Sequence, residues 1–416
     1  MRRNNPWNRL TTRGRVFLIT GPVLAIVGMI VGVVGLLWAG LVLFLLPLIS
    51  LVVMTGQRLR LSCERAFTHG EMSIGQTLDS HLVVSKKGRM SAGILMFEEA
   101  LPRALGRRPR FTVNQSRGAW SRDVHYPLHG LERGRFTVGP LLVRSSDIFG
   151  LVKLDRQFSL TSEVMVTPRI HPLGSMANIA GGGTSGDHRP QKLGVTGQDD
   201  VLVREYRHGD DVRRVHWRST ARRGELMVRR EEQAWDPRVA VLVDNRFGAH
   251  AGVGREGSME YAVSCAASIA CHFVADAFDA SLYDADGILT SSSQAVVGRR
   301  HVIATYTDLK ASQSIDLFSG INAVNTSTSG QVLVAVLGRI SRADADALVR
   351  LRRVQSHGLA IVIDVDSFAS TVSEHRAEHE AAVGILRANL WRVVEVTRDT
   401  PIPDAWRDLE RMGEFV

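Results

Sequence analysis

Cysteine is scarce in this sequence. Among 416 residues there are 3 cysteines, Cys63, Cys265 and Cys271, an odd number without regular spacing. Such a count argues against a disulfide framework and fits a reducing compartment. Cys265 and Cys271 fall within an alanine-rich apolar segment. We therefore expect them to be small core residues and not reactive thiols.

Charge is absent from residues 16–54. A single helix of that length would reach ~58 Å at ~1.5 Å per residue, against a membrane hydrocarbon core of ~30 Å. The run therefore predicts a transmembrane hairpin of two helices over 16–54, with a turn near Gly32–Gly40. It is too long for a signal peptide. The spacing of Gly28 and Gly32 predicts close packing of the two helices.

Basic residues flank this apolar run on both sides. Because positive flanks favour the cytoplasm, we expect a multi-pass protein of the cell membrane. Its soluble bulk and both termini, including the basic residues 1–15, would be cytoplasmic. The flanking residues are Arg2, Arg3, Arg9, Arg13, Arg15, Arg58 and Arg60. The formal net charge of +9 suits an anionic partner, either a lipid surface beside the bilayer or an acidic protein face.

Residues 57–172 lack long helical periodicity and carry short alternating segments, such as Thr77–Val84 and Arg135–Val143, separated by turn residues. This pattern predicts a β-sandwich-like domain. Residues 173–200 are rich in Gly and Ser. Asp187 and His188 follow the glycine run, where a phosphate-binding loop needs Lys and then Ser or Thr. We therefore interpret this segment as a linker or loop.

An Arg-rich stretch follows at 201–235. It predicts a strand over Val201–Arg207, a short helix over Val212–Ala221 capped by Asp210 or Asp211, and a strand over Glu225–Gln233. Gly224 would end the helix.

Two roles remain open for this Arg-rich stretch. Guanidinium groups bind carboxylates and phosphates. The stretch can therefore form an internal salt-bridge lattice or an interaction surface for an acidic protein or an anionic lipid. We expect no nucleic acid. His216 has no accompanying nucleophile motif, so we expect a structural role for it.

Residues 237–400 contain continuous apolar runs at Val239–Val243, Gln331–Leu337, Leu359–Val365 and Trp391–Val396. Such runs are typical of parallel strands buried on both faces. Helical stripes lie between them, and the sequence from Ser341 to Asp344 has the form of a capping box. The fold expected is a doubly wound α/β sheet with its site at the carboxyl ends of the strands, followed by a tail over 401–416.

The Arg-rich stretch resembles the signature of the bacterial family known as domain of unknown function 58. A second block, Arg133–Phe136 with Gly139–Leu141 and Asp147–Leu151, is also similar to that family, although Ile148 replaces its usual Pro. From this resemblance and from the arginines of the stretch we expect an interaction or signature set. Its members are Arg204, Glu205, Tyr206, Gly209, Asp210, Asp211, Arg213, Trp217, Arg218 and Arg222.

The same resemblance implies a von Willebrand factor type A-like C-terminal domain. Such domains hold a divalent cation with a D-x-S-x-S motif, because hard cations prefer oxygen ligands. Here Asp244 keeps the acid, but Arg246 and Gly248 stand at the two Ser positions. We expect Arg246 to lie against Asp244 in place of a cation, and we expect no metal and no cofactor.

The resemblance further implies a partner, a MoxR-type AAA+ ATPase. The function expected is a non-enzymatic adaptor or scaffold in protein-complex remodelling or cell-envelope processes, without catalytic residues. Two alternatives remain: a metal-dependent hydrolase at the strand ends, and an anionic-lipid or nucleic-acid binder. The sequence leaves the oligomeric state undetermined.

Overall fold

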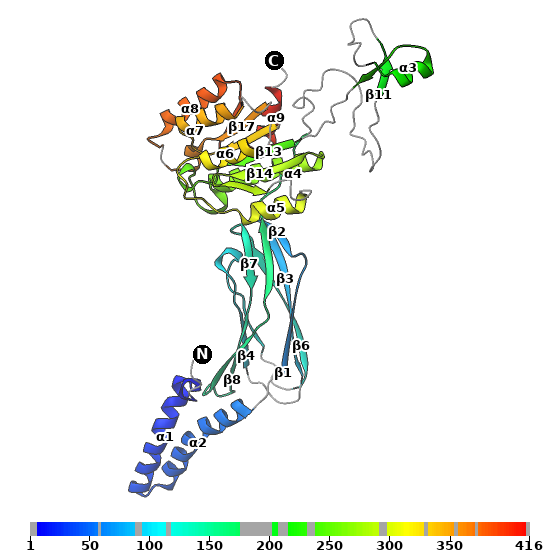
Figure 1. Ribbon diagram of the computed structural model, residues 1–416. Helices are drawn as coiled ribbons and strands as arrows, with labels where there is room; N and C mark the ends of the chain where they lie inside the picture. The colour runs from blue at the N-terminus through cyan, green and yellow to red at the C-terminus, as the bar shows by residue number, and fades with distance from the viewer. Residues whose placement is uncertain are drawn as a thin grey trace. The chain divides into compact units, whose positions relative to one another are not determined.

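The computed structural model describes residues 6–56, 60–87, 94–113, 118–174, 202–206, 215–230, 238–290, 298–327, 332–352, 357–370 and 373–412. The chain forms two compact units (Figure 1). Unit 1 comprises Met1–Arg169, Gly252–Ser264 and Ile303–Lys310. Unit 2 comprises Ile170–Ala251, Cys265–Val302 and Ala311–Val416. Most of the predicted linker, residues 175–200, lies outside the described residues.

Unit 1 begins with two apolar helices, α1 (Thr12–Val31) and α2 (Val34–Gly56), each long and apolar enough to cross a membrane. Gly32 has a φ of 75° and ends α1, because this left-handed conformation suits a residue without a Cβ. The turn therefore falls at the beginning of the predicted Gly32–Gly40 window.

Glycines set the close approach of α1 and α2. A Cβ at Gly28 would lie 2.6 Å from the nitrogen of Leu37, and a Cβ at Gly40 would lie 2.4 Å from that of Ala25. Gly32, by contrast, has open space around it. The predicted Gly28–Gly32 packing pair is therefore right for Gly28 and wrong for Gly32, whose role is to end the helix.

The remainder of unit 1 consists mainly of short β-strands in three sheets, with orders β1-β3-β6, β2-β10-β7 and β5-β4-β8-β9. Their inner faces share one core that includes Leu82, Phe97, Leu128 and Val143. The strands are β1 (Arg60–Phe67), β2 (Glu71–Ser73), β3 (Thr77–Lys87), β4 (Ile94–Glu99), β5 (Arg110–Val113), β6 (Trp120–His129), β7 (Gly134–Val138), β8 (Leu141–Ser146), β9 (Lys153–Phe158) and β10 (Ser162–Thr167).

The strand predicted over Thr77–Val84 is confirmed as part of β3, whereas the single strand predicted over Arg135–Val143 is wrong. Its residues divide between β7 and β8, which belong to different sheets. The break is at Gly139-Pro140. Gly139 has a φ of 101°, and Pro140 has no N–H to donate to a ladder.

The turn between β8 and β9 packs against one end of the helix pair, within unit 1. The Thr11 hydroxyl donates to the carbonyl of Gly150 over 2.7 Å, and its N–H donates to Leu151 over 2.9 Å. Leu10 and Val152 form an isolated antiparallel bridge. The Asp147–Leu151 block of the sequence therefore positions the helices.

Arg133, at the beginning of the same block, also has a structural role within unit 1. The Arg133 side chain is 6% exposed and pairs with Glu260 over 3.1 Å. It also donates to the carbonyls of Thr307, at 3.2 Å, and Leu309, at 2.7 Å. Arg133 therefore joins three segments that are distant in sequence.

Unit 2 contains a six-stranded sheet with the order β15-β14-β13-β16-β17-β18. All neighbours pair in parallel except β14 and β15. The four predicted strands are confirmed, and β14 and β15 are additional. The strands are β13 (Arg238–Val243), β14 (Asp279–Asp284), β15 (Gly287–Thr290), β16 (Val332–Leu337), β17 (His357–Ile363) and β18 (Arg392–Val396).

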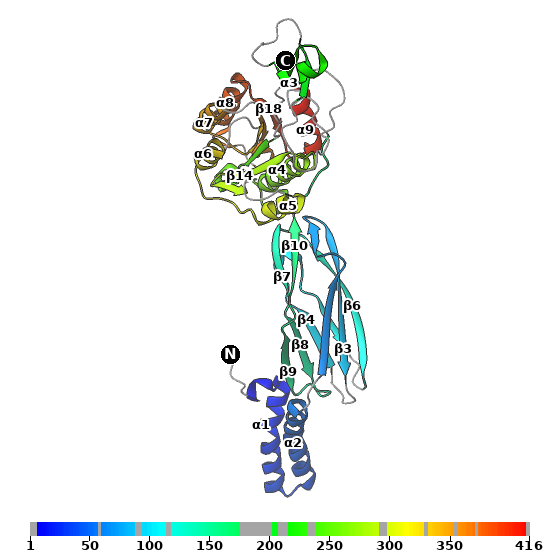
Figure 2. The ribbon, with the colours of Figure 1, turned by 45° about the vertical axis from the view of Figure 1, so that its right-hand side comes forward.

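Helices cover this sheet. One core cluster joins the strands to α6 (Phe318–Ser327), α7 (Arg342–Arg352) and α8 (Arg376–Ala388). Successive residues of β13 and β16 are fully buried, which requires cover on both faces. Figure 2 shows α9 (Ile402–Arg411) on the side of the sheet away from α6–α8.

The segment predicted as a tail, 401–416, carries α9 and is therefore part of unit 2. Trp406 and Leu409 are fully buried, and the Trp406 ring lies 5.6 Å from that of His272. Cys265 and Cys271 are buried, as expected for small core residues. Burial raises the pKa of the Cys265 thiol to about 12, so the thiolate is strongly disfavoured.

Candidate functional site

The sheet of unit 2 has a topological switch point between β13 and β16. From β13 the chain moves to β14 on one side and later returns to β16 on the other side. In open parallel sheets, ligands bind in the crevice where the strand order reverses, outside the carboxyl ends of the strands. Here residues after both strands line a cavity of about 470 Å³. This cavity therefore lies at the edge of the sheet where the sequence analysis expected a site.

The floor of this crevice is a buried arginine that uses all of its donors. Arg246 Nε and Nη2 bond the two carboxylate oxygens of Asp244 at 2.9 and 2.8 Å. Nη1 donates to the Asp344 carboxylate at 3.1 Å and to the Ile315 carbonyl at 3.0 Å. Nη2 also donates to the carbonyl of Arg339 at 3.1 Å. These five bonds match the five N–H groups of a guanidinium.

Asp344 reaches Arg246 from the N-terminus of α7. Its carboxylate accepts from the backbone N–H and the hydroxyl of Ser341, and the Asp344 N–H donates back to the Ser341 hydroxyl. The capping box predicted from the sequence is therefore confirmed. The same carboxylate also accepts from the N–H of Leu317 at 3.1 Å. A helix N-terminus stabilises this negative charge.

The side chains of Asp244, Arg246 and Asp344 are almost completely buried. The three side chains are 0%, 4% and 1% exposed. The two carboxylates raise the pKa of Arg246 against the opposing effect of its burial. The predicted contact between Arg246 and Asp244 is confirmed at 2.8 Å. A guanidinium thus lies against the carboxylate that a divalent cation would need. Gly248, at the second Ser position, is exposed and has no side-chain oxygen to offer.

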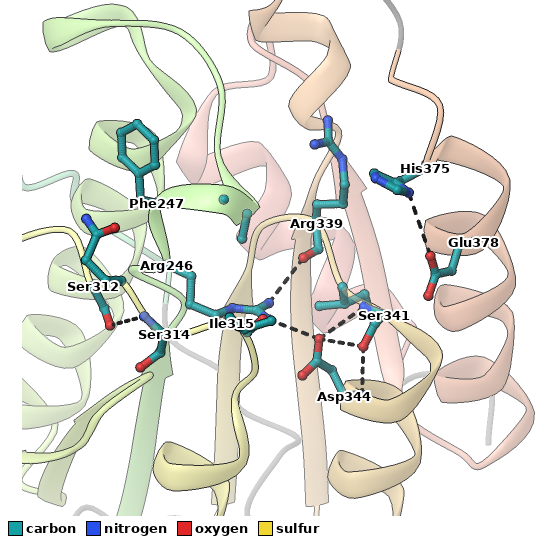
Figure 3. Close-up of a pocket in the computed structure, with 14 residues that line it drawn as sticks. Arg246, Phe247, Ser312, Ser314, Ile315, Arg339, Ser341, Asp344, His375 and Glu378 are labelled. Atoms are coloured by element: carbon teal, nitrogen blue, oxygen red, sulfur yellow. Dashed lines mark hydrogen bonds and ion pairs between the residues drawn. The ribbon is translucent and has the colours of Figure 1, made fainter.

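Figure 3 shows Arg246 between the Arg339 carbonyl and Asp344, with the Phe247 side chain directed away from it. Phe247 is 70% exposed and Ile315 is 94% exposed, and both line the crevice. The polar floor is therefore bordered by two large apolar side chains in solvent.

Two histidines close to the crevice are favoured in their neutral forms. His250 donates from Nε2 to the carbonyl of Asp244 over 2.7 Å, and burial lowers its pKa. His379 Nδ1 accepts from the N–H of Ile340 over 3.2 Å, and burial lowers its pKa as well. Protonation of His379 would remove that acceptor.

We expect acid to destabilise unit 2 through these histidines. A lowered folded-state pKa contributes stability that is present above the ordinary value of about 6.5 and is lost as pH falls towards the folded value. The midpoint of urea unfolding, followed by fluorescence of the buried Trp391 and Trp406, should fall below pH ~6.5. His379→Gln should reduce that slope. His129→Gln, at an exposed position, should not; equal slopes in all three proteins would refute this assignment.

The structure describes only part of the Arg-rich stretch. Its strands are β11 (Leu202–Glu205), which contains Arg204 and Glu205, and β12 (Met227–Arg230), and they pair antiparallel. The Tyr206 N–H donates to Leu226. Trp217 is 69% exposed, and Arg218 and Arg222 are exposed too. The predicted residues Gly209, Asp210, Asp211 and Arg213 lie outside the described residues.

The helix of this stretch begins later than predicted. It is α3 (Trp217–Arg223), whereas the sequence predicted Val212–Ala221 with an aspartate cap. His216 is the cap, since its side chain accepts from the Ser219 N–H. Val215 instead forms a bridge with Val228 and cannot be helical. The structural role predicted for His216 and the end of the helix at Gly224 are confirmed.

Sequence reasoning did not identify Asp344 as the second carboxylate of the buried cluster. Asp344 was recognised only as part of a helix cap, and 98 residues separate it from Arg246. The available signal was its position at the N-terminus of the helix after β16, because that helix begins at the same sheet edge as Asp244. The loop over 312–315 carried no comparable signal.

The architecture and the crevice define the class: a mixed α/β protein with two apolar N-terminal helices, several β-sheets and a mostly parallel sheet with a crevice at its switch point. Residues 202–367 match the family model described as "Protein of unknown function DUF58". Over this range, which is less than half of the chain, the protein is similar to the DUF58 family.

One curated protein that this chain resembles is the "Uncharacterized protein YeaD" of Bacillus subtilis (strain 168). The two are 27% identical over 158 residues, which cover 36% of this chain and 35% of that protein. The chain thus spans about a third of the length of this curated relative.

Two solved structures show weak likeness. One is the CARDB domain of the PF1109 protein from Pyrococcus furiosus, in complex with di-metal ions; it is 10% identical and the match covers 26% of this chain and 93% of that chain, with a TM-score of 0.19. The other is a β-D-mannosidase from Dictyoglomus thermophilum, which is 8% identical to this chain. The match covers 84% of this chain and 36% of that chain, with a TM-score of 0.19. Scores this low carry no argument about fold or function.

Proposed function

We propose that this protein is a membrane-anchored, non-enzymatic adaptor whose von Willebrand factor type A-like α/β unit binds a protein partner at the β13–β16 crevice. The observation that carries this proposal is the use of all five Arg246 donors within the protein. A site that depends on a divalent cation would leave its acidic ligand, here Asp244, open to the metal ion. Here an internal cation neutralises Asp244 permanently, so binding at the crevice needs no metal.

The character of the crevice supports binding over catalysis. Its serine hydroxyls donate to carboxylates: Ser312 and Ser314 to Asp286, and Ser341 to Asp344. A nucleophilic serine needs a neighbouring general base that is free to take its proton and is itself oriented. Asp286 accepts from both hydroxyls, so it serves as an anchor for the 312–315 loop.

The apolar border supports a protein partner in particular. Exposed large apolar side chains beside a polar rim are typical of protein-binding sites. Phe247 and Ile315 supply such a border at the mouth of the crevice. We propose a MoxR-type AAA+ ATPase as the partner, on the basis of the family resemblance, with protein-complex remodelling or a cell-envelope process as the setting.

The membrane anchor is α1 and α2. Many of their apolar side chains are exposed, among them Ile30 at 79%, Val34 at 67% and Trp38 at 60%. Such exposure is costly in water and favourable in lipid. The basic flanks favour a cytoplasmic location for both ends of the helix pair and hence for the soluble bulk. Exposed Ile148 and Phe149, in the turn that packs against the pair, are suited to the same lipid surface.

Co-purification tests this proposal. The full-length protein, solubilised in detergent from native membranes, should retain the MoxR-type ATPase. A Phe247→Ala, Ile315→Ala double variant should lose most of it, because a buried large apolar side chain contributes about 1.5–3 kcal/mol. Each kcal/mol lowers affinity about fivefold.

Ile288→Ala is the matched control. Ile288 is 51% exposed on β15, outside the crevice lining. Its recovery should equal that of the wild type. Wild-type recovery in the double variant would exclude the crevice as the binding site, and an equal loss in the control would show that the effect is not specific to the crevice.

A further inference from the structure

Three side chains of types that can bind a metal ion meet on the outer face of unit 1. His81 lies on β3, and Asp123 and His125 lie two residues apart on β6. β3 and β6 are paired antiparallel, and His81 is directly opposite His125 in the register. The two strands run side by side in Figures 1 and 2. Alternation then places all three side chains on the same face of the sheet.

Their ligand atoms are already gathered. One imidazole nitrogen from each histidine and one oxygen of Asp123 all lie within 4.8 Å of one another. The His125 Nε2 to Asp123 Oδ2 distance is 3.3 Å. Zn–N and Zn–O bonds of ~2.0–2.1 Å in a tetrahedron place neighbouring ligand atoms ~3.3 Å apart. One of the three distances between these ligand atoms thus already fits a tetrahedral site, and the other two are no longer than 4.8 Å.

The backbone beneath these residues is fixed. On the opposite face of the same strands, Leu82, Val84 and Leu128 are fully buried in the core of unit 1. The His81 and His125 rings already face each other edge-on with centroids 4.1 Å apart. Little rearrangement of the backbone would therefore be needed when an ion binds, which is one benefit of a preorganised site.

We propose that His81, Asp123 and His125 form a binding site for a divalent transition-metal ion, with zinc the best fit. Two imidazoles and one carboxylate suit Zn²⁺ in chemistry and number, and they leave a fourth position for water. Mg²⁺ and Ca²⁺ prefer all-oxygen sets and fit poorly. The site is independent of the crevice and of Asp244, where a guanidinium lies against the carboxylate.

Calorimetry with zinc tests this site. The full-length protein, purified in detergent with a tag that contains no histidine and freed of metal with a chelator, is titrated with ZnCl2 near neutral pH. One ion should bind per chain. His81→Ala and His125→Ala should each weaken binding by about tenfold or more, because they remove a ligand atom. Asp123→Asn should weaken it less, because the amide oxygen can still ligate the ion, although more weakly than a carboxylate.

His129→Ala is the control, since His129 is exposed on the same strand and bonds to Thr77. It should bind zinc as the wild type does. Zinc should also raise the melting temperature of the wild type and the control, but not that of a His81→Ala, His125→Ala double variant. Stoichiometric binding that persists in the double variant, or the absence of saturable binding in the wild type, would overturn the proposal.

Discussion

Replacement of Arg246 by Met should destabilise unit 2 by about 3–5 kcal/mol. The change would remove the guanidinium that bonds Asp244 and Asp344, whose side chains are 0% and 1% exposed. Two buried carboxylates would then lack a countercharge. An unpaired buried charge costs far more free energy than the loss of an ion pair on the surface. Urea unfolding of the full-length protein in detergent measures the loss.

Arg144→Ala is the matched control for this prediction. Arg144 pairs with Asp155 over 2.8 Å, but the two side chains are 52% and 61% exposed. Its loss should cost less than about 1 kcal/mol. Arg246→Lys should lie between the two, because an ammonium keeps the charge with fewer donors. If Arg246→Met unfolds at the same urea concentration as Arg144→Ala, the cluster does not hold the strand ends together.

In unit 1, Arg65→Met should cost about 3–5 kcal/mol for a similar reason. The Arg65 and Glu99 side chains are ion-paired and 0% exposed. Arg65 also donates to the Val138 carbonyl and the Ser162 hydroxyl, both at 3.0 Å. It therefore connects β1 and β4 with the paired strands β7 and β10, and so joins three sheets.

The Arg65→Met effect should depend on pH in a defined direction. Burial raises the pKa of Glu99, and Arg65 partly opposes this rise. Without Arg65 the folded-state pKa of Glu99 rises further. A raised pKa means that stability is kept below the unfolded value of about 4.3 and is lost as pH rises through the folded value.

The Arg65→Met variant should therefore have a lower free energy of unfolding at about pH 8 than at about pH 5. Urea unfolding at both pH values measures this difference. Addition of Glu99→Gln should restore stability and remove the pH dependence, because the neutral amide needs no countercharge. A loss that is equal at both pH values, or that the second substitution fails to restore, would contradict the role given to this pair.

Much of the architecture could be predicted because its signals are local. The charge-free run over 16–54 predicted two apolar helices, and α1 and α2 lie there. Four continuous apolar runs predicted four parallel strands, since a strand buried on both faces carries no alternation. The capping box from Ser341 to Asp344 predicted the beginning of α7, because both bonds of that motif lie within four residues.

Other features of the fold could not be predicted correctly, because they have no local signal in the sequence. The alternating pattern over Arg135–Val143 predicted one strand, because alternation of apolar and polar residues does not indicate where a chain passes from one sheet to another. The helix of the Arg-rich stretch was placed too early, since two adjacent aspartates are good caps but His216 caps instead. Strands β14 and β15 carry polar residues and did not match the pattern of a fully buried run.

The sequence by itself determined where the apolar helices and buried strands lie, and that Asp244 is followed by an arginine where a cation ligand would be needed. Only the tertiary structure decided that Asp344 is a second carboxylate bonded to Arg246, and that His81 lies opposite His125. The reason is that hydrophobic periodicity acts over neighbouring residues. Strand pairing and the return of the chain to one sheet edge instead bring together side chains that are far apart in the sequence. No local sequence pattern indicates such contacts.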